Sequence, residues 1–261
     1  MSQFRAMFFN NKFHKGKYSE LDPKHILSTL EKLQLRIEEQ FPDSGLGKVS
    51  LEMKEVAQAI VDFVQKLPRP FWIIRILTFL AITLVIGLAV WLCTLTVRFI
   101  PAGESGLMEV LQGAESATNE LIFLSLAILF LATLENRIKR QASLRSLHRL
   151  RSIAHVVDMH QLTKDPAGIS GEILTTKYPV KRVMSAQELT RYLDFCSELL
   201  AINSKLAALH VQYFQDSEVL KTVNEVEMLA HELSNKIWQK IMILDVMKLG
   251  EGEGEGESEG E

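Results

Sequence analysis

Residues 76–97 form a run of 22 positions without a charged side chain. At about 1.5 Å of rise per residue, this run makes roughly 33 Å of helix, which is enough to cross a hydrocarbon core of about 30 Å. Pro70 and Pro101 stand outside its two ends. Arg75 and Arg98 bracket it, so their side chains can reach the membrane interface. The pattern predicts a first membrane-spanning helix.

A second apolar segment covers residues 121–134, and its 14 uncharged positions give only roughly 21 Å of helix. Extending it outward through Asn119 adds length but includes the charged Glu120. A core helix of a soluble domain is the alternative. We expect a crossing, because the flanks differ in charge and the basic C-terminal part has to return to the basic side. Residues 68–135 are therefore predicted to form a two-helix membrane hairpin.

The charge on the two sides of these segments indicates their direction. The connection from Phe99 to Glu120 has four acids and no Lys or Arg, whereas basic residues precede the first segment and follow the second. Lys and Arg concentrate on the cytoplasmic side of proteins with short loops. We therefore expect the protein in the plasma membrane, with both termini cytoplasmic and the acidic connection outside.

The residues before the first span have helical periodicity. Asp22 is a typical helix cap, Ser50 is the expected cap of a second helix, and Gly45 and Gly47 should separate the two. Residues 1–67 are thus predicted to hold a cytoplasmic arm and two amphipathic helices. Their apolar stripes are Ile26, Leu30, Leu33, Ile37 and Phe41, and then Met53, Val56, Ile60, Phe63 and Leu67.

The residues after the second span predict three more helical segments. The span should run on to Lys164, because no Gly or Pro interrupts it, and residues 163–184 have the Pro and Gly content of a loop. Ser185 and Glu188 form a capping-box pattern, and Asp216 begins the last helix. Heptad-like apolar stripes, typical of a coiled coil, predict a cytoplasmic three-helix bundle over residues 136–249. No alternating strand pattern occurs, so the predicted fold is all-α.

The C-terminal residues 250–261 alternate Gly with six Glu and hold nothing to bury, which predicts a disordered tail. The sequence leaves open whether this tail is native. Without its six carboxylates the net charge of −3 becomes +3.

Cys93 lies in the first span and Cys196 on a predicted cytoplasmic helix, so no disulfide is expected. Cys196 is interpreted as a buried thiol.

Three segments carry a resemblance: residues 150–166 (LRSIAHVVDMHQLTKDP), residues 192–212 and residues 234–241 (SNKIWQKI). They are similar to an uncharacterised family of bacterial two-pass membrane proteins with a helical cytoplasmic domain. The resemblance covers roughly the second half of the chain. It implies a bacterial inner membrane and no particular activity.

The candidate chemistry is sparse. His148 and His155 share a helix face with Asp158, and such ligands suit zinc or iron, but no standard short metal motif is present. A metal site is therefore only a weak candidate, and polar residues satisfied within the bundle are the favoured interpretation. No nucleophile elbow, phosphate loop or dinucleotide motif occurs. We expect no catalytic residue and no cofactor, and no nucleic-acid partner because the basic residues lie next to the membrane.

Three polar residues mark the outer end of the second span: Glu120, Asn119 and Glu115. In an oligomer, Glu120 from several chains could form a ring that attracts cations. The simpler interpretation is that Glu120 lies at the interface and faces water. In the first span, Thr83 and Gly87 form a small-xxx-small pair that allows close contact with the second span or a neighbouring copy.

Four basic residues following the second span, Arg137, Lys139, Arg140 and Arg145, are expected to attract anionic lipid headgroups.

The function predicted from the sequence as a whole is a non-enzymatic membrane protein that self-associates as a homo-oligomer. Its cytoplasmic bundle would act as a scaffold or bind a cytoplasmic protein partner. The first alternative is an oligomeric ion channel or transport component with Glu120 near its outer mouth. A metal-dependent membrane enzyme is the second alternative.

Overall fold

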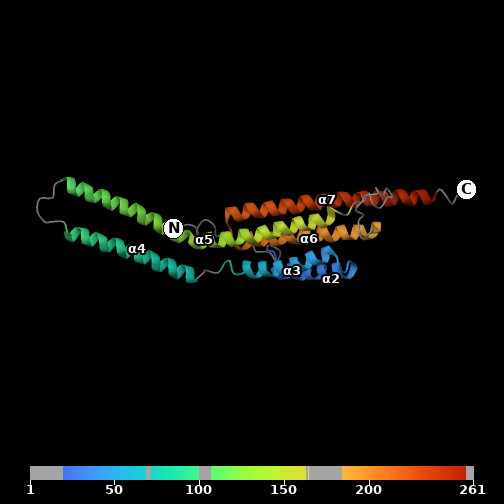
Figure 1. The fold of residues 1–261 in the computed structure, drawn as a ribbon, viewed down its shortest axis with the longest axis horizontal. Coiled ribbons are helices and arrows are strands. Elements are labelled where there is room, and N and C mark those ends of the chain that lie inside the picture. The colour runs from blue at the N-terminus through green and yellow to red at the C-terminus, as the bar shows by residue number, and fades with distance from the viewer. Residues whose placement is uncertain (1–19, 69–71, 100–106, 163, 165–183, 257–261) are drawn as a thin grey trace, which may run out of the picture. The chain divides into compact units, whose positions relative to one another are not determined.

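The computed structural model describes residues 20–68, 72–99, 107–162, 164 and 184–256 (Figure 1). Within these ranges the regular structure is helical and no strand occurs, which confirms the all-α prediction. The described helices are α2 (Pro23–Gln40), α3 (Gly45–Val64), α4 (Trp72–Phe99), α5 (Leu107–Leu162), α6 (Ala186–Tyr213) and α7 (Ser217–Gly256).

The chain divides into two compact units. The first, here called the bundle unit, comprises Met1–Lys66 and Ser143–Glu261; the second, the hairpin unit, comprises Leu67–Ala142. The N-terminal helices and the C-terminal helices, which the sequence pattern assigned to separate regions, therefore belong to one unit. The residues after position 142 continue α5 into the bundle unit.

Helix α2 forms as its sequence predicts. Asp22 is the N-cap, its carboxylate accepts a hydrogen bond from the backbone N–H of Lys24, and Pro23 occupies the first turn. The predicted apolar stripe is buried along its full length: Ile26, Leu30, Leu33, Ile37 and Phe41.

Helix α3 begins earlier than its sequence predicts. Its N-cap is Ser44, whose hydroxyl accepts from the backbone N–H of Gly47, so both predicted separator glycines lie inside the helix. Ser50, the predicted cap, is buried in the first turns and donates to the carbonyl of Gly47. Asp43, the residue before the Ser44 cap, has a φ of 57°. Its left-handed backbone makes the tight turn between α2 and α3. This turn places the cap at Ser44, six residues before Ser50.

Helices α6 and α7 also begin at predicted residues. Ser185 and Glu188 form the complete capping box of α6, and the carboxylate of Asp216 accepts from the first N–H groups of α7. Helix α6 is central to the bundle unit because it packs against α7, α2 and α3. The apolar positions of α7 toward the core are buried: Val219, Val223, Val226, Ala230, Leu233, Ile237, Ile241 and Leu244.

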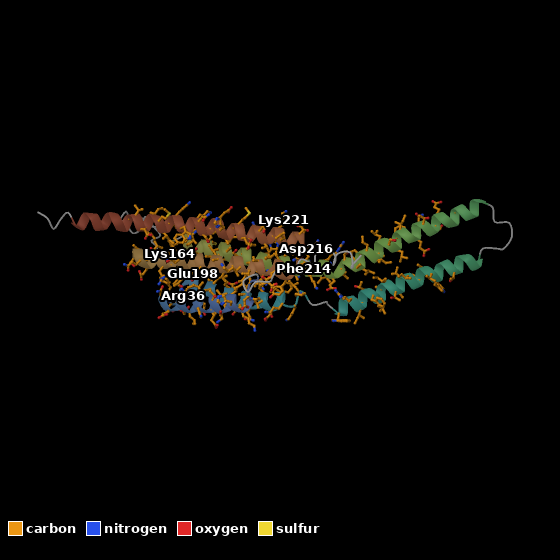
Figure 2. All side chains as sticks on the ribbon, turned by 180° about the vertical axis from the view of Figure 1, so that it is seen from behind. Arg36, Lys164, Glu198, Phe214, Asp216 and Lys221 are labelled. Atoms are coloured by element: carbon orange, nitrogen blue, oxygen red, sulfur yellow. The ribbon has the colours of Figure 1, made fainter. Side chains whose placement is uncertain are left out.

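Hydrogen bonds, an ion pair and an aromatic contact connect α2 and its flanking residues to α6. The side-chain amide of Gln212 accepts from the backbone N–H of Leu21 at 2.9 Å and donates to its carbonyl at 3.1 Å. Arg36 and Glu198 form an ion pair of 2.8 Å, and Figure 2 shows these two side chains side by side. The ring of Phe41 meets that of Tyr192 edge-on at 5.4 Å. The predicted three-helix bundle is therefore extended by the two N-terminal helices.

The hairpin unit has a different surface. Large apolar side chains lie open on both helices, with Phe79 of α4 73% exposed and Phe123 of α5 72% exposed. Among the described helices, Thr118–Leu162 alone is long and apolar enough to cross a membrane by length and composition. Arg75–Trp91 is a shorter apolar helix. The described residues thus show one such helix where the sequence predicts two.

Helix α7 extends into the Gly/Glu tract as far as Gly256, which differs from the predicted disordered tail over residues 250–261. A preformed helix can be extended by one bond per added residue without a new nucleation step. The predicted loop at 163–184 falls almost wholly outside the described residues.

Candidate functional site

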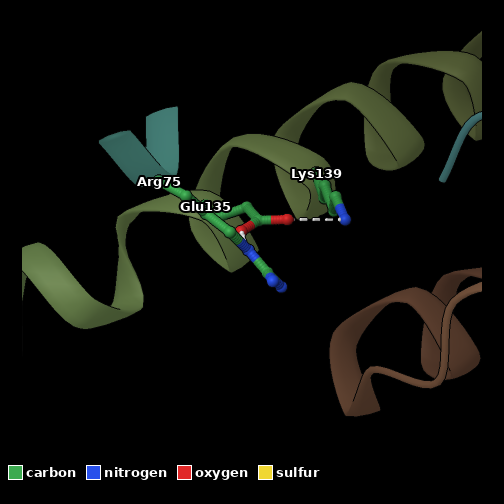
Figure 3. A network of polar contacts seen from close by, with 3 residues as sticks. All are labelled: Arg75, Glu135 and Lys139. Atoms are coloured by element: carbon green, nitrogen blue, oxygen red, sulfur yellow. Dashed lines mark hydrogen bonds and ion pairs between the residues drawn. The ribbon is translucent and has the colours of Figure 1, made fainter. Parts of the chain in front are cut away.

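Glu135 joins the two helices of the hairpin unit. Its Oε2 accepts from Nε of Arg75 on α4 at 2.9 Å, and its Oε1 lies 2.8 Å from Nζ of Lys139 on α5 (Figure 3). The side chains of Glu135 and Lys139 are only 14% and 8% exposed. The carboxylate is therefore shielded and has two cationic partners. The sequence interpretation missed Glu135, although the spacing of Glu and Lys by four positions is a familiar helical pair.

The basic residues expected at lipid headgroups are not equivalent. Lys139 is buried and forms an ion pair with Glu135, and its headgroup role stays a prediction. Arg137 is exposed and lies over the ring of Phe130 at 5.1 Å. Arg145 is exposed and Arg140 is half-buried. A headgroup role stays a prediction for the three arginines as well.

Glu120 lies at an apolar cavity of about 260 Å³ in the hairpin unit. It is the one charged residue of that lining. Asn119 and Glu115, the other two pore candidates, are exposed on α5 and do not line this cavity. A cation pathway therefore stays a prediction about an oligomer. The other lining residues are Val85, Leu88 and Ala89 of α4 and Phe123, Leu124 and Ala127 of α5.

The small residues of α4 leave an open surface. Thr83 is exposed and its hydroxyl donates to the carbonyl of Phe79 within the helix at 2.9 Å. A Cβ placed on Gly87 would meet no atom within 4 Å. Within the described part of this chain, α5 therefore does not cover the Gly87 position, and packing against a neighbouring copy stays a prediction.

The weak metal candidates lie on the surface of the bundle unit. His148 and His155 are exposed, while Asp158 accepts a hydrogen bond from Gln161 at 2.6 Å. No group of three or more His, Cys, Asp or Glu side chains that could hold a metal occurs among the described residues. His148 borders a cavity of about 250 Å³ between α3 and α5, opposite Glu52. This lining includes one histidine and one acid, fewer ligands than a structural metal site uses.

Polar groups inside the bundle unit lack partners. Both amide atoms of Asn203 on α6 and Nε2 of His210 on the same helix are buried without a hydrogen bond. The imidazole of His210 keeps one bond, from Nδ1 to the carbonyl of Leu206 at 3.2 Å, and lies beside the ring of Phe63. Burial lowers the pKa of His210 to about 4, against the weaker raising effect of its backbone hydrogen bonds. The imidazole is therefore neutral in the folded core at pH 7.

Cys196 is a free, fully buried thiol, as its sequence context predicts. Burial raises its pKa to about 12, and the nearby charges of Lys240 and Lys164 lower it by less. Both lysines are distant from Cys196 in the sequence, so the sequence alone does not predict that they lie near the thiol. Lys240 Nζ donates to the carbonyl of Gln161 at 2.9 Å and so caps the C-terminal end of α5. The thiol is therefore shielded and protonated at neutral pH.

Comparison with family models, with curated proteins and with solved structures gives no match to this chain. The resemblance to bacterial two-pass membrane proteins is therefore carried by the sequence segments alone.

Proposed function

We propose that the chain is a non-enzymatic, two-pass membrane protein that self-associates and presents its bundle unit as an interaction or scaffold module. One observation carries the proposal: large apolar side chains of α4 and α5 lie open along both helices. Examples are Trp72, Phe79, Leu84 and Phe123, each more than 70% exposed. Keeping such a side chain out of water is worth about 1.5–3 kcal/mol. Lipid is the environment that removes these groups from water.

The charge distribution supports a cytoplasmic position for both termini. The stretch from Phe99 to Glu120 carries four acids and no Lys or Arg, while Arg75 precedes the apolar part of α4 and Arg137 follows that of α5. Positive residues favour the cytoplasmic side. With this orientation the bundle unit lies in the cytoplasm of a bacterial inner membrane.

Labelling from outside the cell tests this orientation. Glu109→Cys, in a chain with Cys93→Ala and Cys196→Ala, should react with a membrane-impermeant maleimide added to intact cells. The matched variant Glu55→Cys, an exposed position on α3, should react only after lysis. A cysteine at 109 that reacts only after lysis contradicts the orientation.

Two uncovered surfaces support self-association or partner binding. The first is the Thr83 and Gly87 face of α4, where small residues allow a second helix to approach closely. The second is a stripe along α7, on the side away from the core positions of that helix, which holds Leu220, Met228, Trp238, Met242 and Val246 at 46–68% exposure. Exposed apolar stripes of this kind are typical of protein–protein contact sites.

A stoichiometry measurement in native-lipid nanodiscs tests self-association. Gly87→Leu should reduce the oligomeric fraction strongly, because the larger side chain separates neighbouring helices. Gly113→Leu is a matched control, since Gly113 also has open space around it and lies on the other helix. A wild-type chain that stays monomeric contradicts self-association. Equal oligomeric fractions in the two variants exclude the Gly87 face as the interface.

A further inference from the structure

The cavity at Glu120 combines an apolar lining with one negative charge. Leu88 and Ala89 of α4 face Phe123 and Ala127 of α5 across about 260 Å³, and Glu120 is the charged member of the lining. The cavity belongs to the hairpin unit alone. A site of this kind holds an apolar group and fixes its orientation through one polar contact.

Glu120 differs from the other carboxylate described on the apolar part of α5. Glu135 has ion pairs with Arg75 and Lys139. Glu120 is exposed, and it has no ion pair among the described residues. Its carboxylate is therefore accessible to a cationic group that enters the cavity.

We propose that this cavity binds a small amphiphile with one positive charge, such as a short primary alkylamine. Its apolar tail lies against Leu88, Ala89 and Phe123, and its ammonium group donates hydrogen bonds to the carboxylate of Glu120. An alkylamine is charged at pH 7, since its pKa is close to the value of about 10.4 for Lys. An amphiphile with a carboxylate head is repelled. This ligand site does not depend on self-association.

Equilibrium dialysis of the full chain in nanodiscs tests the site. Hexylamine, hexanol and hexanoate share one tail and differ in the head group, and empty nanodiscs measure the partition into lipid. We expect hexylamine to bind about tenfold more tightly than hexanol, with hexanoate weakest. Glu120→Gln should remove this preference for the amine, whereas Glu115→Gln, a carboxylate outside the cavity, should keep it.

The tail contacts need a separate variant. Ala89→Phe fills the cavity and should weaken binding of both hexylamine and hexanol about tenfold; Ala127→Leu does the same from α5 if Ala89→Phe does not fold. Circular dichroism and size-exclusion chromatography identify a variant that is unfolded. Unchanged hexylamine binding by Glu120→Gln, or equal binding of hexylamine and hexanoate to the wild type, would overturn the proposal.

Discussion

The stability of the bundle unit should fall in mild acid because of His210. The imidazole is fully buried, its Nδ1 is bonded to Leu206, and its Nε2 has no partner. Protonation would place a charge beside the ring of Phe63, whose centroid lies 6.2 Å away. Burial therefore disfavours the imidazolium and lowers the pKa to about 4, against an ordinary value of 6.5.

Whether acid raises or lowers the stability depends on which state, folded or unfolded, binds the proton more tightly. Between about pH 6.5 and pH 4 the imidazole of the unfolded chain is protonated while that of the folded chain is neutral. The free energy of unfolding therefore decreases as the pH is lowered through this window. One pKa unit corresponds to about 1.4 kcal/mol, so the full loss is about 3 kcal/mol, reached below about pH 4. At about pH 4.5 the loss is already about 2.5 kcal/mol.

Urea unfolding of the full chain in detergent measures this loss. Far-UV circular dichroism at about pH 7.5 and about pH 4.5 gives the free energy of unfolding at each pH. Acidic groups also titrate near pH 4.5, so the quantity of interest is the difference between wild type and His210→Leu. The wild type should lose about 2.5 kcal/mol more than the variant over this interval.

The control is His155→Gln, which removes an exposed histidine of the same unit and should keep the wild-type pH dependence. If His210→Leu loses as much stability as the wild type between the two pH values, the imidazole is already protonated or solvated in the folded state. The reasoning from burial would then be refuted.

Three further substitutions test individual contacts. A Cβ at Gly45 would meet only the imidazole of His160, a half-exposed side chain that can turn aside, so Gly45→Ala should change the free energy of unfolding by less than about 1 kcal/mol in urea titrations. Asn203 is buried with both amide atoms unbonded, so Asn203→Leu should raise stability by about 1–2 kcal/mol, and a lower Tm would contradict this. Glu135→Gln removes the shielded partner of Lys139 and should destabilise the hairpin by about 2–3 kcal/mol in thermal unfolding; an unchanged Tm would contradict this.

Local features of the fold could be predicted from neighbouring residues. The Asp22 cap, the capping box at Ser185 and the Asp216 start depend on side chains that bond to a backbone group two or three positions away. The buried stripe of α2 follows from helical periodicity. The start of α3 did not follow, because Asp43 adopts a positive φ that places the cap at Ser44.

Contacts between distant parts of the chain could not be predicted in the same way. A stripe shows which face of α2 is buried but not that its partner is α6, which the paired bonds of Leu21 and Gln212 now show. The basic residue Lys139 counted toward the membrane-side charge, yet it faces Glu135 inside the hairpin unit. Charge counts record the type of residue and not its neighbours.

The two carboxylates of α5 show why that distinction bears on function. By sequence alone, Glu120 and Glu135 are both single acids at the ends of one apolar segment. In the structure Glu135 is shielded between Arg75 and Lys139, so its charge is satisfied within the chain and its role is to hold the two helices together. Glu120 instead borders an apolar cavity without an ion pair among the described residues. In the proposed site a cationic ligand therefore pairs with the exposed carboxylate of Glu120, and not with the shielded carboxylate of Glu135.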